Sequence, residues 1–149
     1  MKIKKQVISI VDAELNVKEI TLLSAEEYYT YRYLIPQCNE WWWLRSPGPR
    51  NYRVNIVTVD SDVRTRYTWA KSGGIRPLLK VENSDLKPGD KIILSNYTWT
   101  ALTPKLVLCD KIVKTSVFRY DKESKNANDY NSSDVKTVLN TWAMREKII

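Results

Sequence analysis

The chain of 149 residues carries 24 Lys and Arg against 17 Asp and Glu, a net charge of +7, and combines six Trp and nine Tyr with a single Phe. Because it has no histidine, Ser-His-Asp and Cys-His catalysis and ordinary zinc sites are excluded. The length predicts one domain over residues 1–149. No apolar run approaches the roughly 20 residues of a transmembrane helix, so we expect no contact with a membrane.

The chain is predicted to open with two strands, at residues 5–11 and 17–23, separated by a polar turn. The basic N-terminal segment has only a short apolar stretch, which Asp12 interrupts. We therefore interpret it as a strand rather than as a signal peptide, and we expect a cytoplasmic location.

A helix is predicted to follow at once. Ser24 and Glu27 have the spacing of a capping box, in which each side chain binds the backbone N–H of the other residue. The helix is expected to run to about Leu34, because the residue before Pro36 disfavours helical backbone.

The clearest local signal is a β-hairpin over residues 52–69. In its second arm Arg64 and Arg66 alternate with apolar and aromatic residues, and in its first arm Arg53 lies opposite the apolar positions. This alternation predicts that the arginines gather on one side of the hairpin. The apolar phase changes near Val57, which predicts a β-bulge there.

Most of the excess positive charge lies in the middle of the chain. Between Arg45 and Arg76 there are seven cations and only two carboxylates. Such a concentration favours an acidic partner, either nucleic acid or an acidic protein surface. The predicted partner-binding residues are Arg50, Arg53, Arg64, Arg66 and Lys71. The alternative is a charged strand face that only contacts solvent.

Short strands are predicted at 75–81, 91–96, 97–102 and 105–113, followed by a polar surface loop over 121–132. A last helix is predicted from about Ser133, with Asn131 or Ser132 as its cap. These elements predict an α+β fold with a meandering sheet of short, twisted antiparallel strands, two helices and long loops.

Two motifs are predicted to build the interior of the protein. In a strand, Trp41 and Trp43 share one face, while Trp42 lies on the other face. At least one face must be core. Arg45 and Arg76 are expected to tie loop carbonyls together with their five N–H donors. Direct ligand contact by these residues is the alternative.

The segments TLLSAEEY (21–28), WWWLRSPG (41–48) and GGIRP (73–77) together resemble a family of bacterial and phage domains. That family is similar to the variable proteins of diversity-generating retroelements and to formylglycine-generating enzymes, and the resemblance implies a C-type-lectin-like fold. The second half, KPGDKIILSNYTWTAL to YNSSDVKTVLNTWA, resembles the pieces that open such domains. The order here implies a circular permutation.

No residues are found that would carry catalysis. The formylglycine chemistry implied by the resemblance needs a copper-binding cysteine pair, and Cys38 and Cys109 lie in no such motif. The acids at 60–62 lack the full pattern of a calcium loop, and the glycines at 73–74 form an isolated turn rather than a phosphate loop. We expect a non-enzymatic protein without a cofactor or metal, and with free, buried thiols.

The function expected from the sequence is the binding of a macromolecule. A small phage or mobile-element accessory protein that binds a host protein through its basic surface fits these features, and inhibition of a defence nuclease, as by an anti-CRISPR protein, is one form of this. Direct binding of DNA or RNA is the alternative, and a receptor-recognition or carbohydrate-recognition lectin-like domain is another. Steep salt dependence would indicate nucleic acid.

Overall fold

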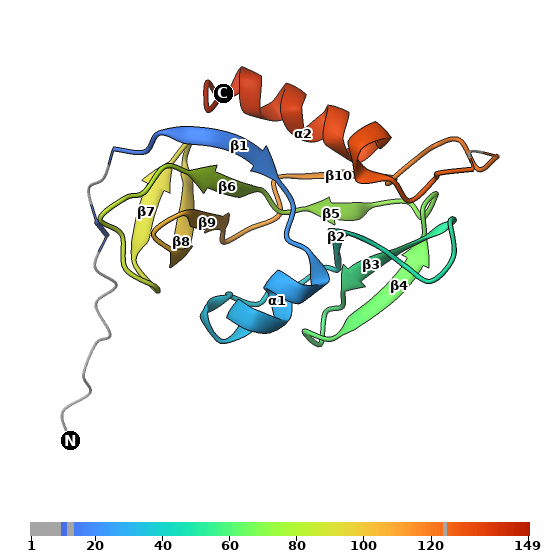
Figure 1. The fold of residues 1–149 in the computed structure, drawn as a ribbon, viewed down its shortest axis with the longest axis horizontal. Coiled ribbons are helices and arrows are strands. Elements are labelled where there is room, and N and C mark those ends of the chain that lie inside the picture. The colour runs from blue at the N-terminus through green and yellow to red at the C-terminus, as the bar shows by residue number, and fades with distance from the viewer. Residues whose placement is uncertain (1–9, 12–13, 124) are drawn as a thin grey trace.

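The protein is an α+β structure in which strands form two sheets (Figure 1). A computed structural model describes residues 10–11, 14–123 and 125–149. The strand predicted over 5–11 lies almost entirely outside these residues. Within them, no helix has the length and apolar character needed to cross a membrane.

Each sheet has five strands in the described part of the chain. The first sheet contains, in spatial order, β1 (Val17–Thr21), β6 (Leu78–Val81), β9 (Leu106–Cys109), β8 (Tyr97–Thr103) and β7 (Lys91–Leu94). The second contains β10 (Lys114–Ser116), β5 (Gly73–Ile75), β2 (Trp42–Pro47), β3 (Arg53–Val57) and β4 (Val63–Tyr67). The prediction of one meandering antiparallel sheet is therefore wrong: there are two sheets, and β2 runs parallel to β5.

Two of the predicted strands are interrupted or end early where the chain passes from one sheet to the other. The segment 75–81 breaks into β5 and β6 at Arg76 and Pro77, since proline has no N–H to offer a sheet ladder. The segment 105–113 ends as a strand at Cys109, and the chain then enters the second sheet as β10. The two crossing segments lie side by side.

Arg76 joins these two crossings. Its Nε donates to the Cys109 carbonyl (2.7 Å) and its Nη2 to the Asp110 carbonyl (3.2 Å). The guanidinium lies 4.9 Å from the centre of the Trp42 ring, and the side chain is only 1% exposed. Burial lowers the pKa of Arg76, against the opposing effect of Cys38 and the Asp110 carboxylate. Arg76 thus supplies donors to two carbonyl groups at the end of β9.

The first helix, α1 (Ala25–Tyr31), begins with the predicted capping box. The Glu27 N–H donates to Ser24 Oγ (3.0 Å), and the Ser24 N–H donates to Glu27 Oε1 (2.8 Å). The chain then tightens into the 3₁₀-helix η1 (Arg32–Leu34), so the α-helix itself is one turn shorter than expected.

A second 3₁₀-helix, η2 (Tyr130–Ser132), lies in the predicted loop and leads into α2 (Asp134–Arg145). The cap of α2 is Ser133, whose Oγ accepts from the Lys136 N–H (3.1 Å). The prediction of Asn131 or Ser132 as the cap is wrong because η2 includes both residues. Figure 1 shows α2 lying along β1 and β10, with α1 on the opposite side of the molecule.

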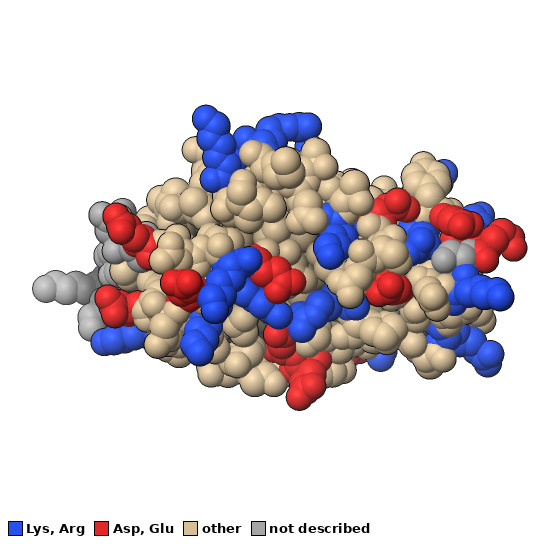
Figure 2. Space-filling view, turned by 45° about the horizontal axis from the view of Figure 1, so that its top comes forward, with Lys and Arg blue, Asp and Glu red and all other residues tan. Residues whose placement is uncertain are grey.

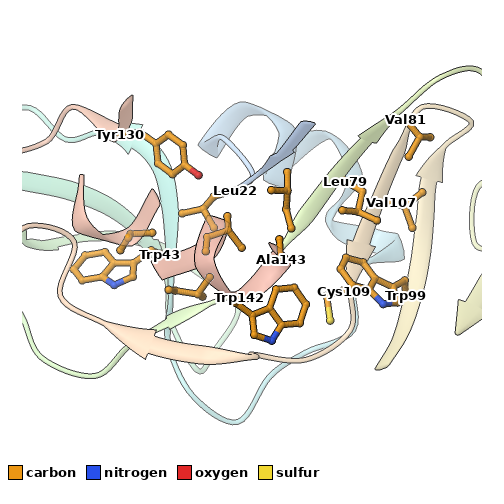
Figure 3. Packing of buried hydrophobic residues seen from close by; sticks show 14 of the residues in the cluster. Leu22, Trp43, Leu79, Val81, Trp99, Val107, Cys109, Tyr130, Trp142 and Ala143 are labelled. Atoms are coloured by element: carbon orange, nitrogen blue, oxygen red, sulfur yellow. The ribbon is translucent and has the colours of Figure 1, made fainter. Parts of the chain in front are cut away.

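The core consists of two clusters separated by β2. Trp43 is fully buried in the larger cluster, which includes Trp99 and Trp142 (Figure 3). Trp42 is buried in the smaller cluster, beneath α1. Half-buried Trp41 lies edge-on to Trp43, with ring centres 4.8 Å apart. Because β2 is buried on both faces, its consecutive tryptophans need no pocket to explain them.

The β3–β4 hairpin pairs continuously from Arg53 with Tyr67 to Val57 with Val63. The bulge predicted near Val57 is therefore wrong, and the irregular pairing lies on the other edge of β3, between Trp43 and Pro47 of β2. The apolar phase changes at Val57 because both faces of β3 are buried: Ile56 packs in the larger cluster and Val57 in the smaller.

Candidate macromolecule-binding surface

The register of the hairpin separates the arginines that were predicted to share one face. Residues paired directly across antiparallel strands lie on the same face of a sheet. Arg53 pairs with Tyr67, whereas Arg64 pairs with Ile56 and Arg66 pairs with Val54. The prediction of a single arginine-rich face is wrong, because Arg53 lies on one side of the hairpin and Arg64 and Arg66 lie on the other.

On the Arg53 side, cations and aromatic rings form a stack that we term the cation–aromatic column. The Arg53 guanidinium lies 4.4 Å from the centre of the Tyr67 ring. Tyr67 stacks on Trp69 at 4.9 Å with 10° between the ring planes, and Lys122 Nζ lies 5.4 Å from the Trp69 ring. Tyr52 flanks both rings, at 6.0 Å from Tyr67 and 6.3 Å from Trp69.

Hydrogen bonds to β4 hold the arginine of the column in place. Arg53 Nη1 donates to the Thr65 carbonyl (3.3 Å) and to Thr65 Oγ1 (3.2 Å), which fixes the guanidinium over Tyr67. Tyr67 nevertheless remains 43% exposed. Attraction of a cation to an aromatic face contributes about 0.5–1 kcal/mol at exposed sites. The column is thus a preorganised surface that combines apolar area with positive charge.

On the opposite side, Arg66 lies 4.3 Å from the centre of the Trp41 ring. Arg64 forms an ion pair with Asp62 (2.7 Å), and both side chains are largely exposed. Arg50 and Lys71 are exposed at the loops beside the hairpin. Of the five predicted binding residues, none is buried, but the structure does not bring all of them onto one surface.

The loop before α2 packs against the end of the hairpin. The Asn51 side chain donates to the Lys125 carbonyl (3.0 Å), and Asn128 donates to the carbonyls of Arg50 (3.0 Å) and Arg53 (3.3 Å). This packing brings Lys122 to Trp69. Sequence reasoning missed Lys122 because no local pattern connects two positions so far apart in the chain.

The same loop brings acidic side chains to the surface. Figure 2 shows that this end of the molecule carries Asp and Glu interleaved with Lys and Arg. Asp121 and Glu123 flank Lys122 in the sequence, and both are exposed. In the folded protein, these acidic side chains therefore partly offset the positive charge of the middle segment of the chain.

Arg45 makes contacts of another kind. Its Nη1 donates to the Leu22 carbonyl (2.6 Å) and forms an ion pair with Glu27. Burial acts to raise the pKa of Glu27, but the hydrogen bonds from Arg45 and Ser24 outweigh it, so the pKa is lowered. Arg45 therefore links the start of α1 to β2.

The two cysteines are free thiols. Burial raises the pKa of Cys109 to about 11, which removes its nucleophilic form at neutral pH. Half-buried Cys38 donates its thiol to the Asp110 carbonyl (3.7 Å). The part of the chain that the structure describes contains no cluster of three or more Cys, Asp or Glu side chains suited to holding a metal ion.

No family model matches this chain, and no curated protein or solved structure matches it significantly. The resemblance to C-type-lectin-like domains stays a prediction. Function must therefore be inferred from the residues of the chain itself.

Proposed function

We propose that the protein is a non-enzymatic recognition module that binds an acidic protein surface through the cation–aromatic column. The observation that carries this proposal is the stack of Arg53, Tyr67, Trp69 and Lys122. Tyr67 and Lys122 are exposed in it, and Arg53 and Trp69 are half-buried. Arginine, tyrosine and tryptophan are the residues that most often dominate binding energy at protein interfaces.

Preorganisation favours binding by this surface. Holding a flexible arginine in one conformation on binding costs about 0.5–1.5 kcal/mol for a single side chain. Arg53 is already held by Thr65 and by the Tyr67 ring. A carboxylate of the partner would therefore meet a guanidinium that is ordered before contact, and arginine offers it a forked pair of donors.

Two features favour a protein partner over nucleic acid. The Tyr67 ring already contacts the Arg53 guanidinium at 4.4 Å and the Trp69 ring at 4.9 Å, and Trp69 also contacts Lys122. A nucleobase that stacked on these rings would compete with those contacts. The exposed Asp121 and Glu123 next to Lys122 would also repel a phosphate backbone, which carries no compensating cations. A protein surface can place basic groups opposite these two carboxylates and acidic groups opposite the cations.

The alternative is the binding of single-stranded nucleic acid. Tyr52, Tyr67 and Trp69 lie within stacking distance of one another. Proteins that bind single strands combine such aromatic surfaces with positive charge, and each stacked base contributes about 1–3 kcal/mol. In this case Lys122 would leave Trp69 and contact phosphate.

The test compares wild-type protein with the double variant Trp69→Ala/Lys122→Glu and with the control Tyr33→Ala, which removes a 79% exposed ring at η1. Each is immobilised and incubated with bacterial lysate, and captured proteins are quantified by mass spectrometry. We expect at least one lysate protein to bind the wild type and the Tyr33→Ala control but not the double variant. Its binding should weaken as the salt concentration rises. Circular dichroism confirms that all three are folded.

The same three proteins are titrated with a fluorescent oligo(dT) strand. We expect only weak binding without saturation. Saturable binding that the double variant loses would instead establish the nucleic-acid alternative. Equal capture of every lysate protein by the wild type and the double variant would refute the role of the column.

Three further expectations belong to this proposal. The first is that the two-sheet α+β structure is a circularly permuted C-type-lectin-like fold, supported by the buried packing of the tryptophans around β2. The second is a cytoplasmic location, supported by two free thiols, as reducing compartments favour them. The third is a host protein as the partner, including a defence nuclease that the module would inhibit.

A further inference from the structure

We propose that Cys38 is a site of reversible covalent modification, at which the thiol exchanges with a small peptide disulfide to form a mixed disulfide. The half-buried side chain follows η1 and lines two cavities of different size. The outer cavity is an open hollow of about 470 Å³, and the inner one is a narrow space of about 10 Å³. The proposal is independent of the column, because neither Trp69 nor Lys122 lines either cavity.

The buried guanidinium of Arg76 lines the inner cavity together with Cys38. Arg76 is 1% exposed, and its Nη1 has no hydrogen-bond acceptor among the described residues. The Trp42 ring, 4.9 Å from the guanidinium, attracts the cation but offers no lone pair. Buried donors without an acceptor are rare in native proteins, so this N–H group calls for an explanation.

A shared hydrogen-bond acceptor fixes the sulfur of Cys38 near this guanidinium. The Asp110 carbonyl oxygen accepts from Cys38 Sγ (3.7 Å) and from Arg76 Nη2 (3.2 Å). Burial lowers the pKa of Arg76, and among the neighbouring groups that oppose this effect Cys38 is the strongest. When the thiol ionises, its sulfur therefore faces a buried cation that still has an N–H group to donate. This contact is internal, so it does not require Nη1 to be open to solvent.

Thiol–disulfide exchange is the reaction that uses this arrangement. The thiolate is the nucleophile, and a neighbouring cation favours it. The Cys38 sulfur attacks one sulfur of the disulfide, a new S–S bond forms, and the old S–S bond breaks. The other half leaves as a thiolate and takes up the proton that Cys38 released. Cys38 is oxidised and the leaving half is reduced, so the step needs no further oxidant, and an excess of reduced thiol reverses it.

The outer hollow favours a peptide disulfide over hydrogen peroxide as the reagent. Peroxide needs no room beside the sulfur, whereas a tripeptide group does, and small-molecule sites span about 300–1,000 Å³. Exposed Lys111 and Glu40 line the hollow together with Gln37 and Asn39. A peptide such as glutathione carries carboxylates, an ammonium group and amides. These groups match the charges and the hydrogen-bonding side chains of the lining.

The other carboxylate of the hollow already has partners within the protein. Asp110 Oδ2 pairs with Lys91 Nζ (2.8 Å), and Asp110 Oδ1 accepts from the Thr100 hydroxyl. The remaining charges of the lining belong to Lys111 and Glu40. Lys111 is therefore the cation that the carboxylates of a peptide disulfide would contact.

The test follows the reaction of the reduced, full-length protein with glutathione disulfide at neutral pH, by mass spectrometry of the intact protein and of its peptides. We expect one glutathionyl group, attached at Cys38 and removed by dithiothreitol. Cys38 should react about threefold faster in the folded protein than in urea, because a gain in thiolate is partly offset by the lower nucleophilicity of a stabilised thiolate. Half-burial without a favourable contact would instead make the folded protein react more slowly.

Two matched charge reversals test the role of the hollow. Lys111→Glu should slow modification by glutathione disulfide about threefold, as expected for a surface charge contact. It should leave modification by the neutral bis(2-hydroxyethyl) disulfide unchanged. Lys105→Glu alters an exposed lysine outside the hollow and should leave both rates unchanged. Circular dichroism confirms that both variants are folded.

Four results would overturn the proposal: no modification of the folded protein, modification of Cys109 in place of Cys38, a rate in the folded protein no higher than in urea, or equal slowing by Lys105→Glu and Lys111→Glu. Loss of lysate capture by the column variant bears only on the proposed function, since that variant leaves both cavities unaltered.

Discussion

Replacing Gly73 with alanine tests whether the glycine and tryptophan motifs act as one packing unit. A Cβ at Gly73 would lie 2.1 Å from Trp43 Nε1, 2.3 Å from Trp43 Cε2 and 2.7 Å from Trp41 Cη2. All three distances are far shorter than van der Waals contact. The glycine is therefore required by space, because the two indoles occupy the volume that any side chain would need.

The loss of stability in Gly73→Ala follows from the displacement of the Trp43 ring. Trp43 is fully buried, and its Nε1 donates to the Ser116 carbonyl of β10 (2.9 Å). Overpacking of a core costs about 1–3 kcal/mol, and the strained indole hydrogen bond adds about 0.5–1.5 kcal/mol. The lower conformational entropy of the unfolded alanine variant adds about 0.4–1 kcal/mol back to the free energy of unfolding. We expect Gly73→Ala to lower the free energy of unfolding by about 2–3 kcal/mol.

Gly74→Ala is the matched control. Its Cβ would lie 2.5 Å from Ile112 Cδ1, the flexible end of a half-buried side chain, and 2.9 Å from the Trp41 carbonyl oxygen. The end of Ile112 can rotate away, but the Trp41 oxygen belongs to the backbone and must shift. Gly74→Ala should therefore also lose stability, but less than Gly73→Ala, whose Cβ would meet a fully buried indole at 2.1 Å. Urea unfolding followed by tryptophan fluorescence measures both variants. A Gly73→Ala protein as stable as wild type, or one more stable than Gly74→Ala, would refute this account of the motifs.

Further predictions concern the buried polar groups. Arg76→Met should lower the free energy of unfolding by about 3 kcal/mol in urea titrations, because it leaves the two carbonyl groups without donors. Arg76→Lys should not restore the stability, since lysine lacks the planar set of donors. Full stability of Arg76→Met would contradict the role of Arg76 in joining the two crossings. Because burial raises the pKa of Cys109 to about 11, iodoacetamide at pH 8 should alkylate Cys38 in the folded protein and Cys109 only in urea. Mass spectrometry measures the alkylation. Equal alkylation rates of the two cysteines in the folded protein would contradict this prediction. The pKa of Glu27 is lower in the folded protein than its usual value of 4.5, so the ionised side chain stabilises the fold at pH values above 4.5. This contribution should be lost as the pH falls through the folded-state pKa. Glu27→Gln should therefore flatten the stability–pH curve below 4.5 but leave its shape unchanged near neutrality.

Several predictions that depended only on neighbouring residues in the chain were confirmed, although the predicted α2 cap and the predicted bulge near Val57 were wrong. The capping box of Ser24 and Glu27 needs only four consecutive residues, and it is present. The alternation of the tryptophans is also a local property, since successive side chains of a strand point to opposite faces. It placed Trp43 in one core cluster and Trp42 in the other.

Predictions that depended on a distant partner were wrong. The sequence shows which side of its own strand Arg53 occupies, but the pairing with Tyr67 decides which residues of β4 share that side. A shift of pairing by one residue moves the side chains of a strand to the other face, and the alternation within each arm did not by itself assign the pairing of Arg53 with Tyr67. The same is true of the long strands predicted at 75–81 and 105–113. The first divides between the two sheets and the second ends at Cys109, and both outcomes depend on contacts between the segments.

Local propensity, periodicity and capping thus determined from the sequence that the protein is α+β, about where its helices begin, and that Trp42 and Trp43 are interior. The tertiary structure alone brought Lys122 to Trp69 and placed Cys38 and Arg76 around one cavity. These residues come from separate segments of the chain. Their proximity arises from strand register and sheet crossing, which depend on the packing of the whole chain rather than on any short stretch of it.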